Sequence, residues 1–330
     1  MNSSRIIGAI DNFKDLKILV IGDFILDAYY KGHVDRVSPE APVPILDVDS
    51  KEFRLGGAAN VARNLSELGA EAILCSVVGI DDPGKLSLDL MTQRGLTTLG
   101  IVKSAKRPTS VKTRLMSEHV QMLRMDEEIT SDLSDQEESA LLNSIVHLMD
   151  THSPTAVVFE DYNKGVLTEV VIKKVIELSK ARGIITAVDP KRQNFFTFAG
   201  VSLFKPNMKE LKEGLNMPNL DATPVQLDKA FTALKEQMAV DVALFTLSAD
   251  GVYITADSSS HHICAIPRNI ADVSGAGDTV IATATCALAS GLNLEETAFL
   301  ANLAGGWVCQ FPGVVPITKD ALKIETDKIL

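Results

Sequence analysis

Short apolar segments of strand length alternate along the chain with segments in which apolar residues recur at helical spacing. The strand-length segments lie at 17–23, 72–79, 155–160, 184–189, 201–204 and 242–247. The helical patterns lie at 58–68, 85–94, 135–150, 168–181 and 224–238, and two more follow at 276–290 and 294–310. Near-continuous apolar strands that alternate with amphipathic helices are typical of a parallel sheet covered on both faces. The pattern therefore predicts an α/β fold.

Two segments interrupt this alternation. Residues 30–54 contain Pro39, Pro42 and Pro44 and have no helical pattern, and residues 98–126 have the pattern of extended pieces with a turn at 117–119. We expect these segments to form a small β-layer at one edge of the main domain, where it could cover a site as a lid. Because no internal repeat or low-complexity linker divides the chain, the sequence predicts a single domain over 1–330 with this β-lid.

Composition and charge exclude several classes of protein. Hydrophobic residues make up 46% of the 330 and charged residues 23%, which is the balance of a folded chain. The formal net charge of −11 argues against a non-specific nucleic-acid binder, although a local basic pocket can still hold a small anion. The sequence has no apolar run of about 18 residues for a membrane span and no secretory signal pattern at its start. The four cysteines form no CxxC pair and are interpreted as reduced thiols, which predicts a cytoplasmic protein.

Three glycine-containing segments compete as phosphate-binding loops. The first, GIDDPGKL at 79–86, nearly matches the P-loop pattern. Pro83 removes a backbone N–H that would hold phosphate, and Leu86 replaces the hydroxyl that holds Mg²⁺. Asp81 and Asp82 would place two negative charges beside those of the nucleotide. We interpret this segment as an ordinary turn into a helix.

The second segment, SGAGDT at 274–279, lies at the start of a predicted helix. Its glycines let a ligand approach the backbone, where free N–H groups and the positive end of the helix dipole point outward. Gly275, Ala276 and Gly277 would then form an anion hole. Asp278 lies in the first turn and suits a base that takes a proton from a hydroxyl attacking phosphorus. The structural alternative is a plain helix start, and a dinucleotide site is disfavoured because the third glycine of its motif is missing.

The third segment, GGAANVA at 56–62, also enters a predicted helix, and its small residues allow close approach of a ligand or of another backbone. Together with 272–279 it resembles the paired signatures of the ribokinase-like (PfkB) carbohydrate kinases. The segments IGDFILD at 21–27, RVSPEAPVP at 36–44, GIDD at 79–82, DYNKG at 161–165, VDPK at 188–191 and KPNMKE at 205–210 resemble, within that family, the heptose 7-phosphate kinases. The resemblance covers essentially the whole chain. It implies a three-layer α/β/α fold with a mainly parallel central sheet and a small β-sheet lid.

The resemblance also implies a reaction and its cofactors. The γ-phosphate of ATP would pass to the anomeric hydroxyl of D-glycero-D-manno-heptose 7-phosphate, giving a 1,7-bisphosphate for activated heptose and surface glycans, with Mg²⁺ as the metal. Asp278 matches the catalytic base of the family, and 275–277 match its anion hole. The residues that match nucleotide-binding positions are Asn207, Glu210, Thr246, Ser248, Gly251 and Asn302. Glu210 would also hold Mg²⁺ through water, and Ser248 stands where many relatives have glycine.

Residues near the start of the chain are candidates for holding the sugar. Asp23 ends the first predicted strand and Asp27 lies four residues further on. Two carboxylates suit pairs of sugar hydroxyls, because hydroxyls donate hydrogen bonds; the structural alternative is a capped turn with solvated acids. Gly56, Gly57 and Asn60 match the sugar-facing loop of the family.

The phosphate that the sugar substrate would already carry needs positive charge near it. In the segment 110–116 the period of two puts Lys112 and Arg114 on one face of a strand. We predict that this face of the lid closes over the sugar, with Lys112 or Arg114 contacting the phosphate. The alternative is a solvated lid face with ordinary surface cations.

Several points stay open. The monovalent-cation site common in the family would use carbonyl groups near Asp272, Ser274, Val308 and Gly313, but Ile317 falls where some relatives carry a hydroxyl, so K⁺ dependence is undecided. An exposed lid edge would favour a homodimer through the lid. Another PfkB-type sugar or sugar-phosphate kinase is the main alternative function, and a non-catalytic nucleotide-binding regulator is a second. The sugar phosphate is the expected partner, with no nucleic acid and no membrane.

Overall fold

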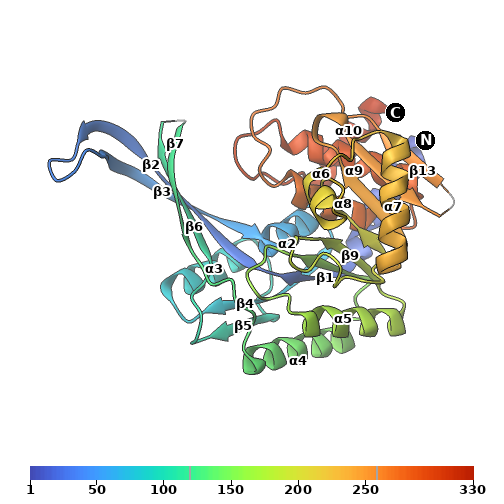
Figure 1. The fold of residues 1–330 in the computed structure, drawn as a ribbon, viewed down its shortest axis with the longest axis horizontal. Helices are drawn as coiled ribbons and strands as arrows, with labels where there is room; N and C mark the ends of the chain where they lie inside the picture. Colours follow the sequence, from blue (N-terminus) through green and yellow to red (C-terminus); the bar gives the residue numbers. More distant parts are fainter. Residues whose placement is uncertain (119, 258) are drawn as a thin grey trace.

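The computed structural model describes residues 1–118, 120–257 and 259–330. Within these residues the larger sheet has nine strands in the order β13-β12-β11-β10-β9-β8-β1-β4-β5 (Figure 1). Their bounds are β1 Lys17–Gly22, β4 Glu71–Gly79, β5 Ile101–Ser104, β8 Ala156–Glu160, β9 Ile185–Asp189, β10 Leu203–Phe204, β11 Val242–Thr246, β12 Val252–Ala256 and β13 Ser259–Ile263. The pairs are parallel from β11 to β5, and β12 and β13 are added antiparallel. The predicted mainly parallel sheet is confirmed.

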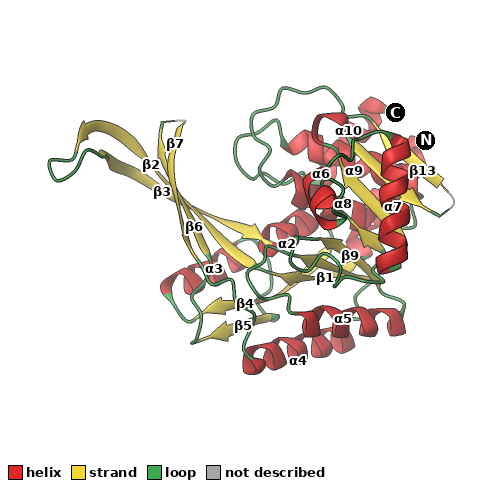
Figure 2. Ribbon diagram, in the orientation of Figure 1, coloured by secondary structure: helices red, strands yellow, loops and turns green. Residues whose placement is uncertain are grey.

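Helices cover both faces of this sheet and give three layers (Figure 2). One face packs against α1 (Ser3–Asp11), α2 (Ala58–Glu67), α3 (Asp82–Gln93), α8 (Ala276–Ala289), α9 (Leu294–Val308) and α10 (Lys319–Ile329). The other packs against α4 (Asp135–His152), α5 (Glu169–Arg182), α6 (Met208–Gly214) and α7 (Pro224–Met238). Burial on both faces explains why the central strands are apolar at nearly every position. Among the described residues, no helix combines the length and apolar character needed to cross a membrane.

A smaller sheet of four strands, in the order β3-β2-β6-β7, projects from one side of the body (Figure 1). It consists of β2 (Phe24–Val37), β3 (Pro44–Gly57), β6 (Val111–Ser117) and β7 (Val120–Glu127). The expected boundaries of the lid at 30–54 and 98–126 need correction at both segments. The first part of the lid runs from the start of β2 at residue 24 to the end of β3 at residue 57, beyond the expected bounds at both ends. In the second segment, residues 101–104 form β5 and pair with β4 in the larger sheet. Residue 119 of the expected turn at 117–119 lies outside the described residues.

The P-loop-like segment 79–86 is a capped helix start. Asp81 is the N-cap of α3, and its carboxylate accepts a hydrogen bond from the Gly84 N–H at 2.7 Å. The Thr109 N–H and hydroxyl donate to the same carboxylate at 2.8 and 2.7 Å. The carboxylate of Asp81 therefore binds the free N–H groups at the start of α3, where a P-loop would bind phosphate. This agrees with the interpretation of 79–86 as an ordinary turn into a helix.

Candidate active site

The order of the strands places a site at one edge of the larger sheet. The chain leaves β1 for β4 and β5 on one side and returns to β8 on the other side of β1. In open α/β sheets, ligands bind beyond the carboxyl ends of the strands at such a reversal. Polar residues stand at these ends: Asp23 follows β1, Glu160 ends β8, Asp189 ends β9 and Lys205 follows β10.

The predicted base, Asp278, lies in the first turn of α8 and is buried, with 6% of its surface exposed. The amide of Asn60 donates to its Oδ2 at 2.6 Å, and the hydroxyl of Tyr162 donates to Oδ1 at 3.3 Å. Burial raises the pKa of Asp278 to about 6, the negative charge of Asp189 acts in the same direction, and Asn60 and Lys205 oppose it. At neutral pH the carboxylate is therefore mostly ionised and more basic than an ordinary aspartate, as a general base requires.

Two further carboxylates surround the base. One oxygen each from Glu160, Asp189 and Asp278 lie within 4.8 Å of one another, and all three residues are buried. Both oxygens of Glu160 are buried without a hydrogen-bond partner. Burial, followed by the charges of Asp189 and Asp278, raises the pKa of Glu160 well above its usual value. A pocket of converging carboxylate oxygens with unsatisfied acceptors fits a hard divalent cation such as Mg²⁺.

The expected anion hole faces the same cluster. Gly275 is the N-cap of α8 with φ of +78°, in the left-handed region that favours glycine. A side-chain carbon at 277 would lie 3.5 Å from an oxygen of Asp189 and 3.7 Å from Nζ of Lys205. Lys205 is itself 2.9 Å from Asp189 and almost fully buried. The backbone of 275–277 and a buried lysine therefore border one small space beside Asp278.

The residues expected to hold nucleotide phosphate and Mg²⁺ form a helix cap. Oδ1 of Asn207 accepts from the Glu210 N–H at 2.9 Å, and Oε2 of Glu210 accepts from the Asn207 N–H at 2.9 Å. Nζ of Lys191 donates to Oε1 of Glu210 at 2.5 Å. Thr246 at the end of β11 forms a β-bridge with Asn207, so these predicted residues lie together. Both oxygens of Glu210 have partners, and a Mg²⁺-bound water would compete with Lys191 for one of them.

Two of the other predicted nucleotide residues, Gly251 and Asn302, border the end of β13 and the residues after it. Ser248 has φ of +55° and Gly251 φ of +89°, so the expected glycine-to-serine replacement at 248 puts a side chain in the left-handed region. The amide of Asn302 on α9 donates to the carbonyl of Cys264 at 2.9 Å. A side chain at 251 would collide with the backbone of 263–265. Gly251 and Asn302 are thus brought to one segment, 263–265.

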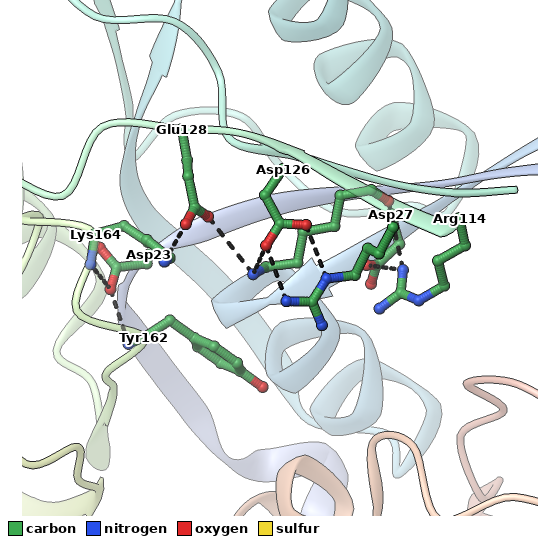
Figure 3. A network of polar contacts seen from close by, with 9 residues as sticks. Asp23, Asp27, Arg114, Asp126, Glu128, Tyr162 and Lys164 are labelled. Carbon is green, nitrogen blue, oxygen red and sulfur yellow. Dashed lines mark hydrogen bonds and ion pairs between the residues drawn. The ribbon is translucent and has the colours of Figure 1, made fainter. Parts of the chain in front are cut away.

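Of the two acids expected to hold sugar hydroxyls, Asp23 has a different role. It is fully buried, and its carboxylate accepts hydrogen bonds from the backbone N–H groups of Tyr162 at 2.8 Å and Lys164 at 3.0 Å (Figure 3). It also accepts a bond from the backbone N–H of Val166 at 3.1 Å. These bonds fix the loop that carries Tyr162 to Asp278. We therefore remove Asp23 from the sugar contacts and assign it to positioning this loop.

Asp27, by contrast, lies beside the glycine pair. A side chain at 56 would lie 2.3 Å from Oδ2 of Asp27, and one at 57 would lie 2.4 Å from the carbonyl oxygen of Asp23. Gly57 also has φ of +56°, which favours glycine. Nη1 of Arg114 is 2.6 Å from Oδ1 of Asp27. The two glycines are therefore required by the carboxylate of Asp27 and by the close approach of two backbones.

The lid cations are already paired with carboxylates (Figure 3). Nζ of Lys112 lies 3.3 Å from Asp126 and 3.5 Å from Glu128. Glu128 also binds Lys164 at 2.6 Å, which joins β7 to the loop that Asp23 holds. A phosphate on Lys112 or Arg114 would have to share these cations with the carboxylates, so phosphate contact at either residue stays a prediction.

The loop expected near a monovalent cation is closed by Asp272. One oxygen of Asp272 accepts from the Ser274 N–H at 2.9 Å, and the other accepts from the Gly313 N–H at 2.9 Å. Val308 ends α9, and Ile317 is fully buried. Asp272 thus joins the two segments whose carbonyl groups would hold K⁺.

Glu160, Asp189, Lys205, Tyr162 and Lys191 were missed as site residues by the sequence analysis. A signal for three of them was present, because Glu160, Asp189 and Lys205 stand at or just after the carboxyl ends of predicted strands. Tyr162 and Lys191 lie in segments that carried the family resemblance without assigned roles.

Comparisons with known proteins identify the family of the chain. Residues 15–320 match the pfkB family of carbohydrate kinases. The chain is 41% identical over 312 residues to the "Bifunctional protein HldE" of Methylobacillus flagellatus and 37% identical over 309 residues to that of Pelobacter propionicus. Each match covers 93% of this chain. The chain spans 62% of the length of these two relatives.

Solved structures share the fold. Phosphofructokinase-2 from Escherichia coli in complex with potassium superposes with a TM-score of 0.78 at 19% identity, covering 95% of this chain and 99% of that one. Ribokinase from Arabidopsis thaliana in complex with ribose and ATP gives 0.74 at 18% identity, covering 94% and 98%. Because residues 15–320 match the model of the pfkB family, the chain belongs to this family of carbohydrate kinases and is a phosphotransferase.

Proposed function

We propose that this kinase transfers the γ-phosphate of ATP to the anomeric hydroxyl of D-glycero-D-manno-heptose 7-phosphate and forms the 1,7-bisphosphate. The observation that carries the chemistry is the buried carboxylate of Asp278 beside the N-terminus of α8. The support for the sugar is the similarity, at 41% and 37% identity, to relatives named HldE, together with the run at 36–44.

In the proposed mechanism Asp278 takes the proton of the acceptor hydroxyl as the oxygen attacks phosphorus. Asn60 and Tyr162 hold its two oxygens, so the carboxylate keeps one orientation. The N–H groups of 275–277 and the ammonium of Lys205 stabilise the negative charge on the transferred phosphoryl group. Mg²⁺, when bound by Glu160 and Asp189, would neutralise phosphate charge. Asn207, Thr246, Ser248, Gly251 and Asn302 would border the nucleotide, with Glu210 near the metal.

On the sugar side we propose that Asp27, Asn60 and the backbone of Gly56 and Gly57 hold the hydroxyls. The lid formed by β2, β3, β6 and β7 would cover the sugar and bring Lys112 and Arg114 to it. Exclusion of water by such a cover protects the phosphoryl group from hydrolysis. We also propose a cytoplasmic location and a homodimer through the lid, and K⁺ near Asp272 and Ser274 is an optional component.

The test is ADP release with a panel of sugar phosphates at a fixed ATP concentration, followed by NMR of the product. Heptose 7-phosphate should give the highest kcat/KM and a product phosphorylated at the anomeric oxygen. A higher kcat/KM for fructose 1-phosphate or tagatose 6-phosphate would replace heptose by that sugar. Absence of ADP release with every sugar, from protein that binds ATP, would favour the regulator alternative.

A further inference from the structure

A cavity of about 260 Å³ lies between the base of the smaller sheet and the helices α2 and α3. Three arginines reach it from separate elements: Arg54 from β3, Arg63 from α2 and Arg94 from the end of α3. Glu52 is the single acidic side chain among the described residues that line it. The remaining lining residues are apolar: Phe53, Leu55, Leu90, Val314 and Val315.

The positive charge of this arginine pocket is not balanced by the chain. Glu52 is shared, because Lys31 binds it at 2.6 Å and Arg54 at 2.5 Å. Among the described residues, no carboxylate forms an ion pair with Arg63 or Arg94. Nε of Arg63 is buried without a hydrogen-bond partner, and its Nη1 has one long bond, 3.4 Å, to the carbonyl of Val314. Three arginines with one shared acid, on a chain of net charge −11, indicate a place for an anion.

The arginine pocket adjoins the sugar side of the active site. Arg63 lies three residues after Asn60 on α2, about 4.5 Å further along the helix axis, and Asn60 binds the base Asp278. Val314, which lines the pocket, would be 3.0 Å from a side-chain carbon at 275. Arg54 of β3 stands directly opposite Asp27 of β2 in the antiparallel register, so the two side chains lie on the same face of the sheet. An elongated molecule with one end at Asp278 and its middle at Asp27 therefore points toward this pocket.

We propose that Arg54, Arg63 and Arg94 bind the phosphate group that the sugar substrate carries at the end remote from the acceptor hydroxyl, an inference that rests on the proposed function. The planar guanidinium presents two parallel N–H groups and matches phosphate oxygens better than an ammonium does. Lys112, the competing candidate, is held between two carboxylates, whereas Arg63 has a donor with no partner. The pocket would thus select phosphorylated sugars over free ones.

The first test compares steady-state kinetics of Arg63→Gln and Arg94→Gln with those of the wild type. Each substitution should raise KM for heptose 7-phosphate about 10- to 100-fold, the loss of one charge-assisted contact to phosphate. KM for ATP, and KM for the same heptose without its phosphate, should change less than about twofold, because neither molecule reaches the pocket. Arg182→Gln is the matched control, since that arginine pairs with Asp150 on the opposite helical layer.

Two kinetic outcomes would overturn the proposal. Equal increases of KM for phosphorylated and free heptose would show that the arginines do not contact the phosphate. A phosphate-selective loss in Lys112→Gln but not in Arg63→Gln would place the phosphate at the lid. Arg94 is exposed at the end of its helix, so Arg94→Gln gives a folded variant even if Arg63→Gln proves unstable in thermal unfolding.

The second test is independent of turnover and uses calorimetric titration with inorganic phosphate. Wild type should bind phosphate, heptose 7-phosphate should compete with it, and Arg63→Gln should bind it about tenfold or more weakly. Phosphate binding that depends on Arg63 but is not displaced by the sugar phosphate would indicate a separate effector site and overturn the substrate assignment. If heptose 7-phosphate is not turned over while Arg63-dependent binding persists, the proposed function fails and the anion site stands. Equal binding by wild type and Arg63→Gln rejects the site.

Discussion

At the scale of single residues, the fold buries the carboxylate of Asp278, where burial disfavours its ionised form. Asp278 is buried near Glu160 and Asp189, and its pKa is raised to about 6 by this burial and by the charge of Asp189. Each oxygen of Asp278 has one donor, from Asn60 or Tyr162, which orients the group without neutralising it. In the proposed function, a buried charge held in this way would serve catalysis at the expense of stability.

If Asp278 is the base, Asp278→Asn should lower kcat strongly. The substitution keeps the size of the side chain and removes the base, so kcat should fall roughly 10²- to 10⁴-fold. Affinity for ATP should change much less, because the anion hole of 275–277 is formed by backbone. Steady-state kinetics and nucleotide titration measure the two quantities. Retention of more than about a tenth of the activity would remove Asp278 from the role of base.

The stability side predicts that the same substitution makes the folded protein more stable. The folded-state pKa of about 6 exceeds the usual aspartate pKa of 3.8, so ionisation of Asp278 destabilises the folded state. This cost is absent below pH 3.8, grows as the pH rises, and is complete above pH 6, where it amounts to roughly 1–3 kcal/mol. Denaturant unfolding should show Asp278→Asn to be more stable than wild type at pH 8, with the difference closing toward pH 4. A less stable variant at pH 8 would contradict the assigned direction.

At the scale of elements, the burial of a strand determines whether its sequence pattern reveals it. The central strands were predictable because burial on both faces makes them continuously apolar, and β1, β8 and β9 fall within one residue of the predicted segments. The smaller sheet was harder, because its strands carry alternating charged residues, and the four residues of β5 show no pattern that would assign them to β4. Helices α1, α6 and α10 and strands β12 and β13 were not predicted.

The residues of the candidate site also differ in whether the sequence alone could reveal them. Asp278, Asn60 and the glycine loops were predictable because each motif is local in sequence. The role of Asp23 was not, because its partners in the loop 162–166 lie 139 to 143 residues away and no local spacing reveals them. Glu160 and Asp189 ended predicted strands, yet their convergence with Asp278 depends on which strands are neighbours.

The two glycine loops give a matched pair of element-scale variants. Lys85→Ala should leave ATP affinity and kcat near those of wild type, because the carboxylate of Asp81 caps the helix that carries Lys85. Gly277→Val should abolish activity while the protein still folds, because the side chain would enter the space beside Asp189 and Lys205. Nucleotide titration, kinetics and circular dichroism test the pair. Loss of ATP binding in Lys85→Ala would favour the P-loop interpretation instead.

At the scale of the whole molecule, the smaller sheet leaves an apolar edge in solvent. β7 is an edge strand, and all eight of its positions are exposed. Leu123 is 54% exposed and Met125 41% exposed. Both lie on the face opposite Arg124 and Asp126, which form an ion pair at 2.8 Å. An uncovered edge with apolar side chains favours pairing with another chain.

We expect the free protein to be a dimer, with β7 packed against a second copy of the smaller sheet. Leu123→Asp would place a charge in that interface on both copies and should convert the dimer to a monomer at micromolar concentration, because an unpaired buried charge costs several kcal/mol. Light scattering coupled to size exclusion measures the mass. The matched control is Val225→Asp, since Val225 is 66% exposed and belongs to α7, a helix that Figure 1 shows far from the smaller sheet. Because the residues proposed to border the nucleotide all lie outside the smaller sheet, ATP affinity should be unchanged in the monomer. A dimer that persists in Leu123→Asp would place the interface elsewhere, and a monomeric wild type would reject the dimer.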